Sequence, residues 1–378
     1  MTRVSVAKKK DAKPGVELES SSAKLLAGEA VARIRKEHGA NIFGRASDFV
    51  KPRRSIPTGI FRLDYALGGG FPVGLVSVLW GHKSSGKTTT YLKAIANAQR
   101  MCAVCWEFTE ACSCGKSYRD PVIAFLDVEG TLDLAWAKRL GVDLDRLLLS
   151  TPEYAEQSLD IAEAVLRRGV DVLVMDSLAF LTPAKEIMQS TIEDTVGLQA
   201  RQIGKGTRKF VAALNTVKNA RGFAPTLLFT NQVRMKVGVM FGSPETQPGG
   251  LATGFASATE TRLRAGKYEM DEVLGKPVAA DFGFRVDKNK ASFARMEGEF
   301  RLAMADTEHR RVGDAVNEGD MVEMAQKVGL VEGSGSSWRA LGEKYRAKSL
   351  IEKEILTNPE FHDKLHRALT AVLLSDHE

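Results

Sequence analysis

The sequence lacks any apolar run of the roughly 20 residues that a membrane-spanning helix requires. Its N-terminus is basic and contains no apolar segment of the length found in signal peptides. No internal repeat is present, and the 6 histidines are too scattered to form a metal site. Cysteine is confined to one short stretch, with all 4 residues between positions 102 and 114. We therefore expect a cytoplasmic protein that does not act at a membrane.

The composition predicts a soluble globular protein with a large core. The chain has 378 residues, of which 44% are hydrophobic and 26% are charged, so it is long enough for more than one domain. Its net charge of +6 and its isoelectric point near 9.0 suit a polyanionic partner. Many basic proteins bind no polyanion, so charge alone leaves nucleic acid an open alternative.

The stretch LVSVLWGHKSSGKTTT, which begins at Leu75, carries the clearest motif. A predicted strand leads into GHKSSGKT, which matches the phosphate-loop pattern G-x-x-x-x-G-K-S/T, and a predicted helix follows. Gly81 and Gly86 let backbone N–H groups point at one phosphate, Lys87 would reach the β- and γ-phosphates, and Thr88 would bind Mg²⁺. A chance glycine-rich turn is the alternative, which the lysine, the threonine and the flanking elements disfavour. The predicted nucleotide-binding residues of this loop are Gly81, Ser84, Ser85, Gly86, Lys87, Thr88 and Thr89.

Two later predicted strands end in carboxylates. The mostly apolar residues 122–128 precede Glu129, and residues 171–176 end in Asp176. In an open parallel sheet the carboxyl ends of the strands face the nucleotide. Asp176 is therefore predicted to hold Mg²⁺ or its bound water, and Glu129 is a candidate general base for an attacking water. The alternative for Glu129 is an ordinary glutamate in a surface loop.

A further predicted strand, residues 225–231, is followed by Gln232, whose side chain would lie near the γ-phosphate and sense hydrolysis. The segment after it, residues 233–251, holds six glycines or prolines together with Arg234 and Lys236. Loops of this length within a compact domain are usually functional or mobile. Its flexibility and its cations are typical of a segment that orders on a phosphate backbone, and a plain surface loop is the alternative.

The four cysteines follow the spacing C-x-x-C-x6-C-x-C. They are Cys102, Cys105, Cys112 and Cys114. Four thiolates on one short loop can close a tetrahedral Zn²⁺ site, whereas disulfides would be reduced in the cytoplasm. We predict structural zinc; the alternative is a loop with free or transiently oxidised thiols.

Several stretches together resemble the RecA family of recombinases, from about Ala23 to Ser375. They are GHKSSGKTTT, FLDVEGTLDLAWAKRLGVDLDRLLLS, DVLVMDSLAFLTPAKEI and NQVRMKVGVMFGSPETQPGG. The last resembles the second DNA-binding loop of the family almost residue for residue, and bacterial and phage-encoded members share it. The resemblance implies an α/β fold: a RecA-like P-loop NTPase core with a mostly parallel central sheet, an N-terminal polymerisation helix and a small α-rich C-terminal domain.

On this basis we divide the chain into four parts. Residues 1–22 are predicted to be a disordered basic tail, and residues 23–55 an oligomerisation segment whose amphipathic helix runs from Ala23 to His38. Residues 56–308 would form the ATPase core, with the cysteine insertion at 102–116. Residues 309–378 would form the helical C-terminal domain.

The resemblance also implies roles at the nucleotide site. Lys87, Thr88 and Asp176 would bind phosphate and Mg²⁺, Glu129 would be the catalytic glutamate, and Gln232 would sense the γ-phosphate of ATP. Two further residues would contact adenine, namely Asp133 and Trp136, the latter in place of a stacking tyrosine. Lys288 and Lys290 would reach into the ATP site of a neighbouring subunit, although composition alone suggests a solvated turn there.

The remaining roles concern DNA and assembly. The implied DNA-binding residues are Arg201, Arg234, Met235, Lys236, Gly249 and Gly250, with a first DNA loop at 187–198. Phe255 would contact the adjacent protomer of a helical filament. The implied partners are single- and double-stranded DNA, further copies of the chain, and single-strand-binding and loader proteins, in recombinational repair and the SOS response.

Some residues depart from the family pattern. Lys83 replaces an acidic residue in the phosphate loop, Gly130 replaces a histidine after Glu129, and the cysteine insertion is extra. We therefore hypothesise an ATP-dependent recombinase and keep two alternatives: a related motor that migrates or unwinds branched DNA, and a filament-forming mediator that binds ATP and DNA without exchanging strands.

Overall fold

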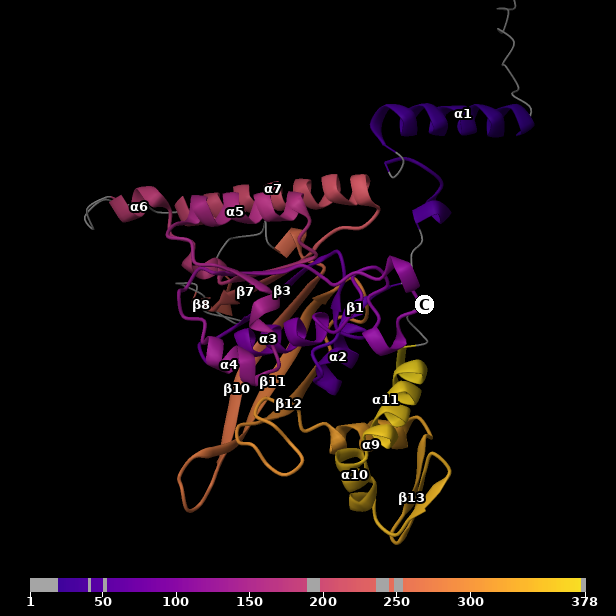
Figure 1. Ribbon diagram of the computed structural model, residues 1–378, viewed down its shortest axis with the longest axis vertical. Helices are drawn as coiled ribbons and strands as arrows, with labels where there is room; N and C mark the ends of the chain where they lie inside the picture. Colours follow the sequence, from indigo (N-terminus) through magenta and orange to yellow (C-terminus); the bar gives the residue numbers. More distant parts are fainter. Residues whose placement is uncertain are drawn as a thin grey trace, which may run out of the picture. The chain divides into compact units, whose positions relative to one another are not determined.

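A computed structural model describes residues 20–39, 42–49, 53–188, 198–235, 245–247 and 254–374 of the protein. The chain forms two compact units, residues 1–50 and residues 51–378 (Figure 1). The first unit contains helix α1 (Ser20–His38), as predicted, and the short 3-10 helix η1 (Ala46–Phe49). The Arg35 guanidinium connects them, because it donates to the Asp48 carboxylate at 2.8 Å. Most of the predicted basic tail lies outside the described residues.

The second unit is built on one sheet of eight strands. Across the sheet these are β12 (Glu297–Ala303), β11 (Pro277–Asn289), β10 (Thr259–Met270), β3 (Val76–Gly81), β7 (Thr226–Gln232), β6 (Val172–Asp176), β4 (Ile123–Asp127) and β5 (Leu147–Ser150). All neighbours from β10 to β5 are parallel, whereas β10, β11 and β12 pair antiparallel. The predicted α/β fold with a mostly parallel sheet is confirmed.

Helices cover both faces of the sheet because its central strands are apolar on both sides. In β6, Val172 and Val174 pack in one core cluster with residues of α2 and α3, while Leu173 and Met175 pack in another with residues of α5 and α7. Figure 1 shows α5 and α7 running together over the sheet. The helices of the core are α2 (Phe61–Leu67), α3 (Lys87–Ala98), α4 (Leu134–Arg139), α5 (Ala155–Arg168), α6 (Ala184–Met188) and α7 (Leu198–Arg221).

The carboxyl ends of the parallel strands meet at one edge of the sheet. Gly81 of β3 is in register with Gln232 of β7, and Asp127 of β4 is in register with Asp176 of β6. The phosphate loop, both carboxylate-bearing strands and the start of the glycine-rich loop are therefore brought to the same edge, as the sequence predicted.

The C-terminal region contains strands as well as the predicted helices. Its elements are α9 (Glu318–Lys327), β13 (Val331–Ser334), β14 (Ser337–Ala340), β15 (Glu343–Tyr345), α10 (Lys348–Thr357) and α11 (Pro359–Leu374). The three strands form a small antiparallel sheet that the sequence analysis missed, since strands of three or four mostly exposed residues give little periodic signal. Phe61 of α2 packs in the same cluster as Ile351 and Leu365, and Arg62 pairs with Asp320 at 2.6 Å. The boundary predicted between residues 308 and 309 lies within this second unit and stays a prediction.

Other elements differ from the sequence prediction mainly at their ends. Residues 254–256, which include Phe255, form a helical turn, and β10 starts at Thr259. The glycine- and proline-rich residues before the phosphate loop contain α2 and a two-stranded pair, β1 (Ser55–Ile56) with β2 (Phe71–Pro72). Among the helices in the described ranges, none combines the length and the apolar character needed to cross a bilayer.

The packing of α3 against the sheet can be tested at Tyr91. Its fully buried hydroxyl lies 3.1 Å from the carbonyl oxygen of Ser77 and 3.0 Å from that of Phe229, so one helix residue ties to two neighbouring strands. We expect Tyr91→Phe to lower the free energy of unfolding by about 1 kcal/mol, measured by urea denaturation. Tyr118→Phe is the matched control, because its hydroxyl contacts the exposed Asp120 and its loss should cost less than about 0.5 kcal/mol. Equal effects of the two substitutions would contradict this assignment.

Candidate nucleotide site and cysteine cluster

The phosphate loop joins β3 to α3 in a conformation that its glycines require. A Cβ atom on Gly81 would lie 2.2 Å from the carbonyl oxygen of Leu263, so no other residue fits there. Gly86 has φ 84° and Ser84 has φ 61°, both in the left-handed region. The loop therefore curls above the N-terminus of α3, where unpaired backbone N–H groups favour an anion. This geometry fits the predicted phosphate site.

Lys87 folds back onto its own loop. Its Nζ donates to the carbonyl oxygens of His82 at 2.7 Å and Gly81 at 3.2 Å. Burial lowers the pKa of Lys87, although the nearby charges of Asp176 and Glu129 oppose that shift. The ammonium group is thus held by neutral carbonyl oxygens, with the carboxylates of Asp176 and Glu129 nearby. Phosphate oxygens are charged and would be stronger acceptors.

Asp176 is held by hydroxyl groups from two other elements. Thr88 Oγ1 donates to Asp176 Oδ2 at 2.5 Å, and the Thr230 hydroxyl of β7 donates to Asp176 Oδ1. Burial raises the pKa of Asp176, against the effect of these hydrogen bonds. A cation at this point would relieve the cost of a buried carboxylate, and hydroxyl and carboxylate oxygens are ligands that Mg²⁺ accepts. The residues present therefore fit Mg²⁺, which Thr88 and Asp176 would hold.

Glu129 lies at the same edge of the sheet. It contacts Gln232, which was predicted as a site residue, and Ser177, which was not. Ser177 Oγ donates to Glu129 Oε1 at 2.6 Å, and Gln232 Nε2 donates to the same oxygen at 3.2 Å. The candidate general base and the candidate sensor, which are 103 positions apart, are thus in direct contact. The arrangement suits a carboxylate whose orientation is fixed before it accepts a proton.

The predicted adenine-contacting residues border the phosphate loop. The indole Nε1 of Trp136 donates to Thr89 Oγ1 at 3.3 Å. Asp133 Oδ1 accepts from the backbone N–H of Trp136 at 2.9 Å and so caps the N-terminus of α4. Their contact with adenine stays a prediction.

The structure does not bring the predicted lysine pair to the phosphate loop of the same chain. Lys288 lies on β11 and donates to the carbonyl oxygen of Gly254 and, at 3.4 Å, to Ser257 Oγ. Lys290 is exposed just beyond the strand. Phe255, which is 75% exposed, lies on the helical turn beside Gly254. An action of these residues in a neighbouring subunit stays a prediction.

Part of the predicted DNA-binding set falls on described residues. Arg201 is exposed on α7, and Arg234 is exposed on β8 (Arg234–Met235). Strand β8 pairs with β9 (Glu245–Thr246), and Met235 is in register with Glu245. Lys236, Gly249 and Gly250, and residues 189–197 of the predicted first DNA loop, lie outside the described residues.

The sequence did not predict four residues of this site. Ser177 contacts Glu129, and Thr230 contacts Asp176. The other two, His82 and Glu245, contact each other. Thr230 has a weak signal in the sequence, because it is a polar residue near the end of an otherwise apolar strand. The pairing of His82 with Glu245 has none, since they are 163 positions apart.

The four cysteines come together as predicted. Their sulfur atoms all lie within 4.8 Å of one another, and Cys105 Sγ is 3.6 Å from Cys112 Sγ. Zn²⁺ with bonds of about 2.3 Å would place tetrahedral sulfurs roughly 3.8 Å apart. Backbone N–H groups of Val104 and Cys114 point at Cys102 Sγ and Cys112 Sγ, each at 3.4 Å. The cluster could therefore hold a metal ion.

The thiol pKa values diverge within this cluster. Burial opposes ionisation of Cys102, but backbone N–H groups from Arg119, Cys105 and Val104 outweigh it and lower the pKa to about 6. Hydrogen bonding with Cys105 is the main cause that raises the pKa of Cys114 to about 12. Crowded sulfurs cannot all ionise alone, and a bound cation would remove that conflict.

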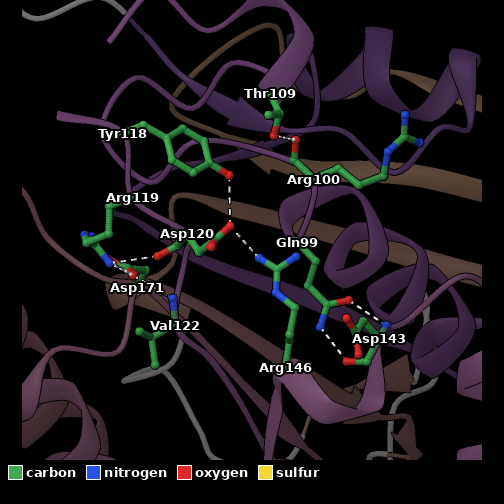
Figure 2. A network of polar contacts seen from close by, with 10 residues as sticks. All are labelled: Gln99, Arg100, Thr109, Tyr118, Arg119, Asp120, Val122, Asp143, Arg146 and Asp171. Atoms are coloured by element: carbon green, nitrogen blue, oxygen red, sulfur yellow. Dashed lines mark hydrogen bonds and ion pairs between the residues drawn. The ribbon is translucent and has the colours of Figure 1, made fainter. Parts of the chain in front are cut away.

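A polar network anchors the cysteine segment to the sheet (Figure 2). Arg119 forms a two-pronged pair with the buried Asp171 at 2.6 and 2.7 Å, and the Val122 N–H donates to the same carboxylate at 2.8 Å. Asp171 directly precedes β6, the strand that ends in Asp176. On the outer side, Arg146 pairs with Asp120 at 2.7 Å. The residues that directly follow the cysteine insertion are thus attached to the amino-terminal end of β6, whereas the nucleotide site lies at its carboxyl end.

Comparison with known proteins gives one consistent result. A family model described as the RecA N-terminal domain matches residues 24–307. Protein RecA of Nocardioides sp. is 35% identical over 346 residues, which cover 90% of this chain and 89% of that protein. Protein RecA of Acinetobacter baylyi is 34% identical over 353 residues, covering 92% and 91%. Protein RecA of Francisella tularensis subsp. novicida is also 34% identical over 353 residues, covering 91% and 88%.

The anchor of the cysteine segment can be tested by substitution. Arg119→Ala leaves Asp171 buried without its ion-pair partner, and we expect the free energy of unfolding to fall by about 2 kcal/mol. This value is below that of a fully buried pair because the Arg119 side chain is 41% exposed. Arg146→Ala removes an exposed pair and should cost under about 1 kcal/mol in the same urea titration. A cost no larger for Arg119→Ala than for this control would contradict the anchoring role.

Proposed function

The chain belongs to the RecA family, and from that premise we propose that it is an ATP-dependent DNA recombinase that forms a helical filament on single-stranded DNA and exchanges strands with a homologous duplex. The family implies binding of ATP, Mg²⁺ and DNA and assembly with copies of itself. One observation carries the more specific proposal. The 3.2 Å hydrogen bond from Gln232 to Glu129 joins the nucleotide edge of the sheet to the strand that leads into the DNA loop.

The residues of the nucleotide edge divide the chemistry among them. Lys87 moves from the His82 and Gly81 carbonyls to the phosphates, while the loop N–H groups hold the anion. Thr88 and Asp176 would hold Mg²⁺, which would supply positive charge near the phosphate oxygens. Glu129, fixed by Ser177, accepts a proton from the attacking water.

Gln232 links this chemistry to DNA affinity. Its amide contacts Glu129 in the present structure, and a γ-phosphate offers it a stronger acceptor. A change of partner at Gln232 is passed directly to Arg234 and the paired strands β8 and β9, because only Val233 separates them. We propose that this change orders the loop for binding single-stranded DNA.

Contacts to DNA would come from the second predicted loop and from Arg201, which lies just beyond the first. Arg201 and Arg234 are exposed cations on described elements, and Lys236, Gly249 and Gly250 complete the proposed set. Such contacts would go to the phosphate backbone, while base pairing between strands reads the sequence.

Assembly would complete the site in trans. Lys288 and Lys290 lie away from the phosphate loop of their own chain, which supports a role in the ATP site of a neighbour. Burial and the charge of Lys290 lower the pKa of Lys288, and a phosphate partner would reverse that effect. The exposed Phe255 ring beside them suits a protein–protein contact.

We further infer that the cysteine cluster holds one structural Zn²⁺. Metal analysis of the purified protein should give about one Zn per chain, as expected for a site with four thiolate ligands. Cys105→Ser should lower the metal content and the melting temperature together. Ser113→Ala, at a neighbouring position outside the ligand set, is the control and should change neither. A content well under one Zn per chain in the unmodified protein would contradict this inference.

The recombinase proposal is tested by strand exchange with homologous and heterologous duplex DNA. We expect product only with the homologous duplex. Translocation or unwinding without homology would instead indicate a motor, and DNA binding with ATP but no exchange would indicate a mediator.

The role of Glu129 is tested by Glu129→Gln. This change should lower DNA-stimulated ATP turnover by about 100-fold or more and trap the protein on single-stranded DNA, because binding residues remain while the general base is lost. Glu272→Gln, an exposed glutamate in the turn between β10 and β11, is the matched control and should behave like the unmodified protein. Unchanged turnover in Glu129→Gln would exclude Glu129 as the base.

A further inference from the structure

His82 connects the phosphate loop to the DNA loop by a direct side-chain contact. It follows Gly81 at the end of β3, and its Nε2 lies 2.9 Å from Glu245 Oε1 on β9. The hydrogen bond to His82 is the main cause that lowers the pKa of Glu245, so the carboxylate is ionised and accepts while the imidazole donates. A residue of the nucleotide loop therefore holds a described strand of the DNA loop.

The backbone of His82 faces the nucleotide. Its carbonyl oxygen accepts from Lys87 Nζ at 2.7 Å, the shorter of the two carbonyl contacts of that lysine. A phosphate oxygen would compete with this carbonyl group for Lys87 Nζ, because a charged oxygen is the stronger acceptor. The same residue thus contacts Lys87 through its carbonyl group and Glu245 through its ring.

Glu245 also contacts the central sheet through a second partner. Its carboxylate also pairs with Arg262 of β10, and both side chains are less than one-fifth exposed, at 17% and 16%. The Arg262 guanidinium lies 5.2 Å from the ring centroid of Trp80, the residue that precedes Gly81. Glu245 is therefore shared between Arg262 of β10 and His82 of the phosphate loop.

We propose that His82 is a positioning residue that couples nucleotide binding to the DNA loop through Glu245, independently of Gln232. The inference rests on the proposed function, since it concerns how ATP changes DNA affinity. The two connections use different atoms. Gln232 contacts Glu129 and leads into β8. His82 contacts Lys87 through its carbonyl group and β9 through its ring.

Gln247, the residue that follows β9, is also held by side chains of β7 and β10. Asn231 Nδ2 donates to Gln247 Oε1 at 3.3 Å, and Gln247 Nε2 donates to Glu260 Oε2 at 3.3 Å. Loss of His82 therefore leaves the segment 245–247 attached to the core. This is why we expect His82→Ala to weaken the response to nucleotide without abolishing DNA binding.

The test compares the affinity for a fluorescent oligothymidylate with a Mg²⁺-bound non-hydrolysable ATP analogue and with Mg²⁺-ADP. The ratio of the two dissociation constants should fall about fivefold in His82→Ala, a coupling loss at the small end of the usual range. His82→Gln retains an N–H donor and should restore most of the ratio.

Two further variants sharpen the result. His309→Ala, which removes an exposed histidine beside Glu308, is the matched control and should leave the ratio unchanged. In a double-mutant cycle, His82→Ala combined with Glu245→Gln should reduce the ratio little more than Glu245→Gln alone. Fully additive effects, or an unchanged ratio in His82→Ala, would overturn the inference.

The outcomes separate this inference from the function on which it rests. If the unmodified protein binds the oligonucleotide equally with both nucleotides, the proposed function fails and the coupling role fails with it. If the unmodified protein responds to the triphosphate and His82→Ala responds equally, only the role of His82 is overturned.

Discussion

The nucleotide edge of this protein depends on one buried carboxylate. Asp176 accepts hydroxyl hydrogen bonds from Thr88 of the phosphate loop and from Thr230 of β7. Its carbonyl oxygen accepts from the backbone N–H groups of Val128 and Glu129, at 2.8 and 3.2 Å. A buried carboxylate without donors would destabilise the fold, so its hydroxyl partners fix the end of β6 relative to the phosphate loop and β7. The main-chain carbonyl group of Asp176 adds the link to the residues that follow β4. A bound cation would satisfy the same requirement and is therefore favoured at this point.

From this carboxylate, the nucleotide edge reaches the DNA loop by short polar contacts. Glu129, held by Ser177, touches Gln232, and the lysine of the phosphate loop touches the carbonyl group of His82, whose ring holds Glu245. Both connections end on the small β8–β9 pair, in which each strand has two residues. An element of this size is suited to change state when a ligand alters its supports.

The sequence predicted what is encoded locally and missed what depends on register. The phosphate loop, Asp176, Glu129, Gln232 and the four cysteines each stand in a short motif whose residue spacing carries the chemistry. Thr230, Ser177 and Arg119 could not be assigned, because their roles follow from which strand lies beside which, and no short motif records that. The strands of the C-terminal region were missed since they are short and mostly exposed. The lysine pair on β11 shows the opposite limit: its predicted role concerns a second subunit, which one chain does not contain.

The central claim is that the nucleotide site changes the β8–β9 pair before DNA is present. Backbone amide hydrogen exchange of residues 232–235 and 245–247, measured without DNA, tests it most directly. We predict that a Mg²⁺-bound non-hydrolysable ATP analogue slows exchange in both segments relative to Mg²⁺-ADP. Identical exchange with the two nucleotides, under conditions where both occupy the site, would contradict the account.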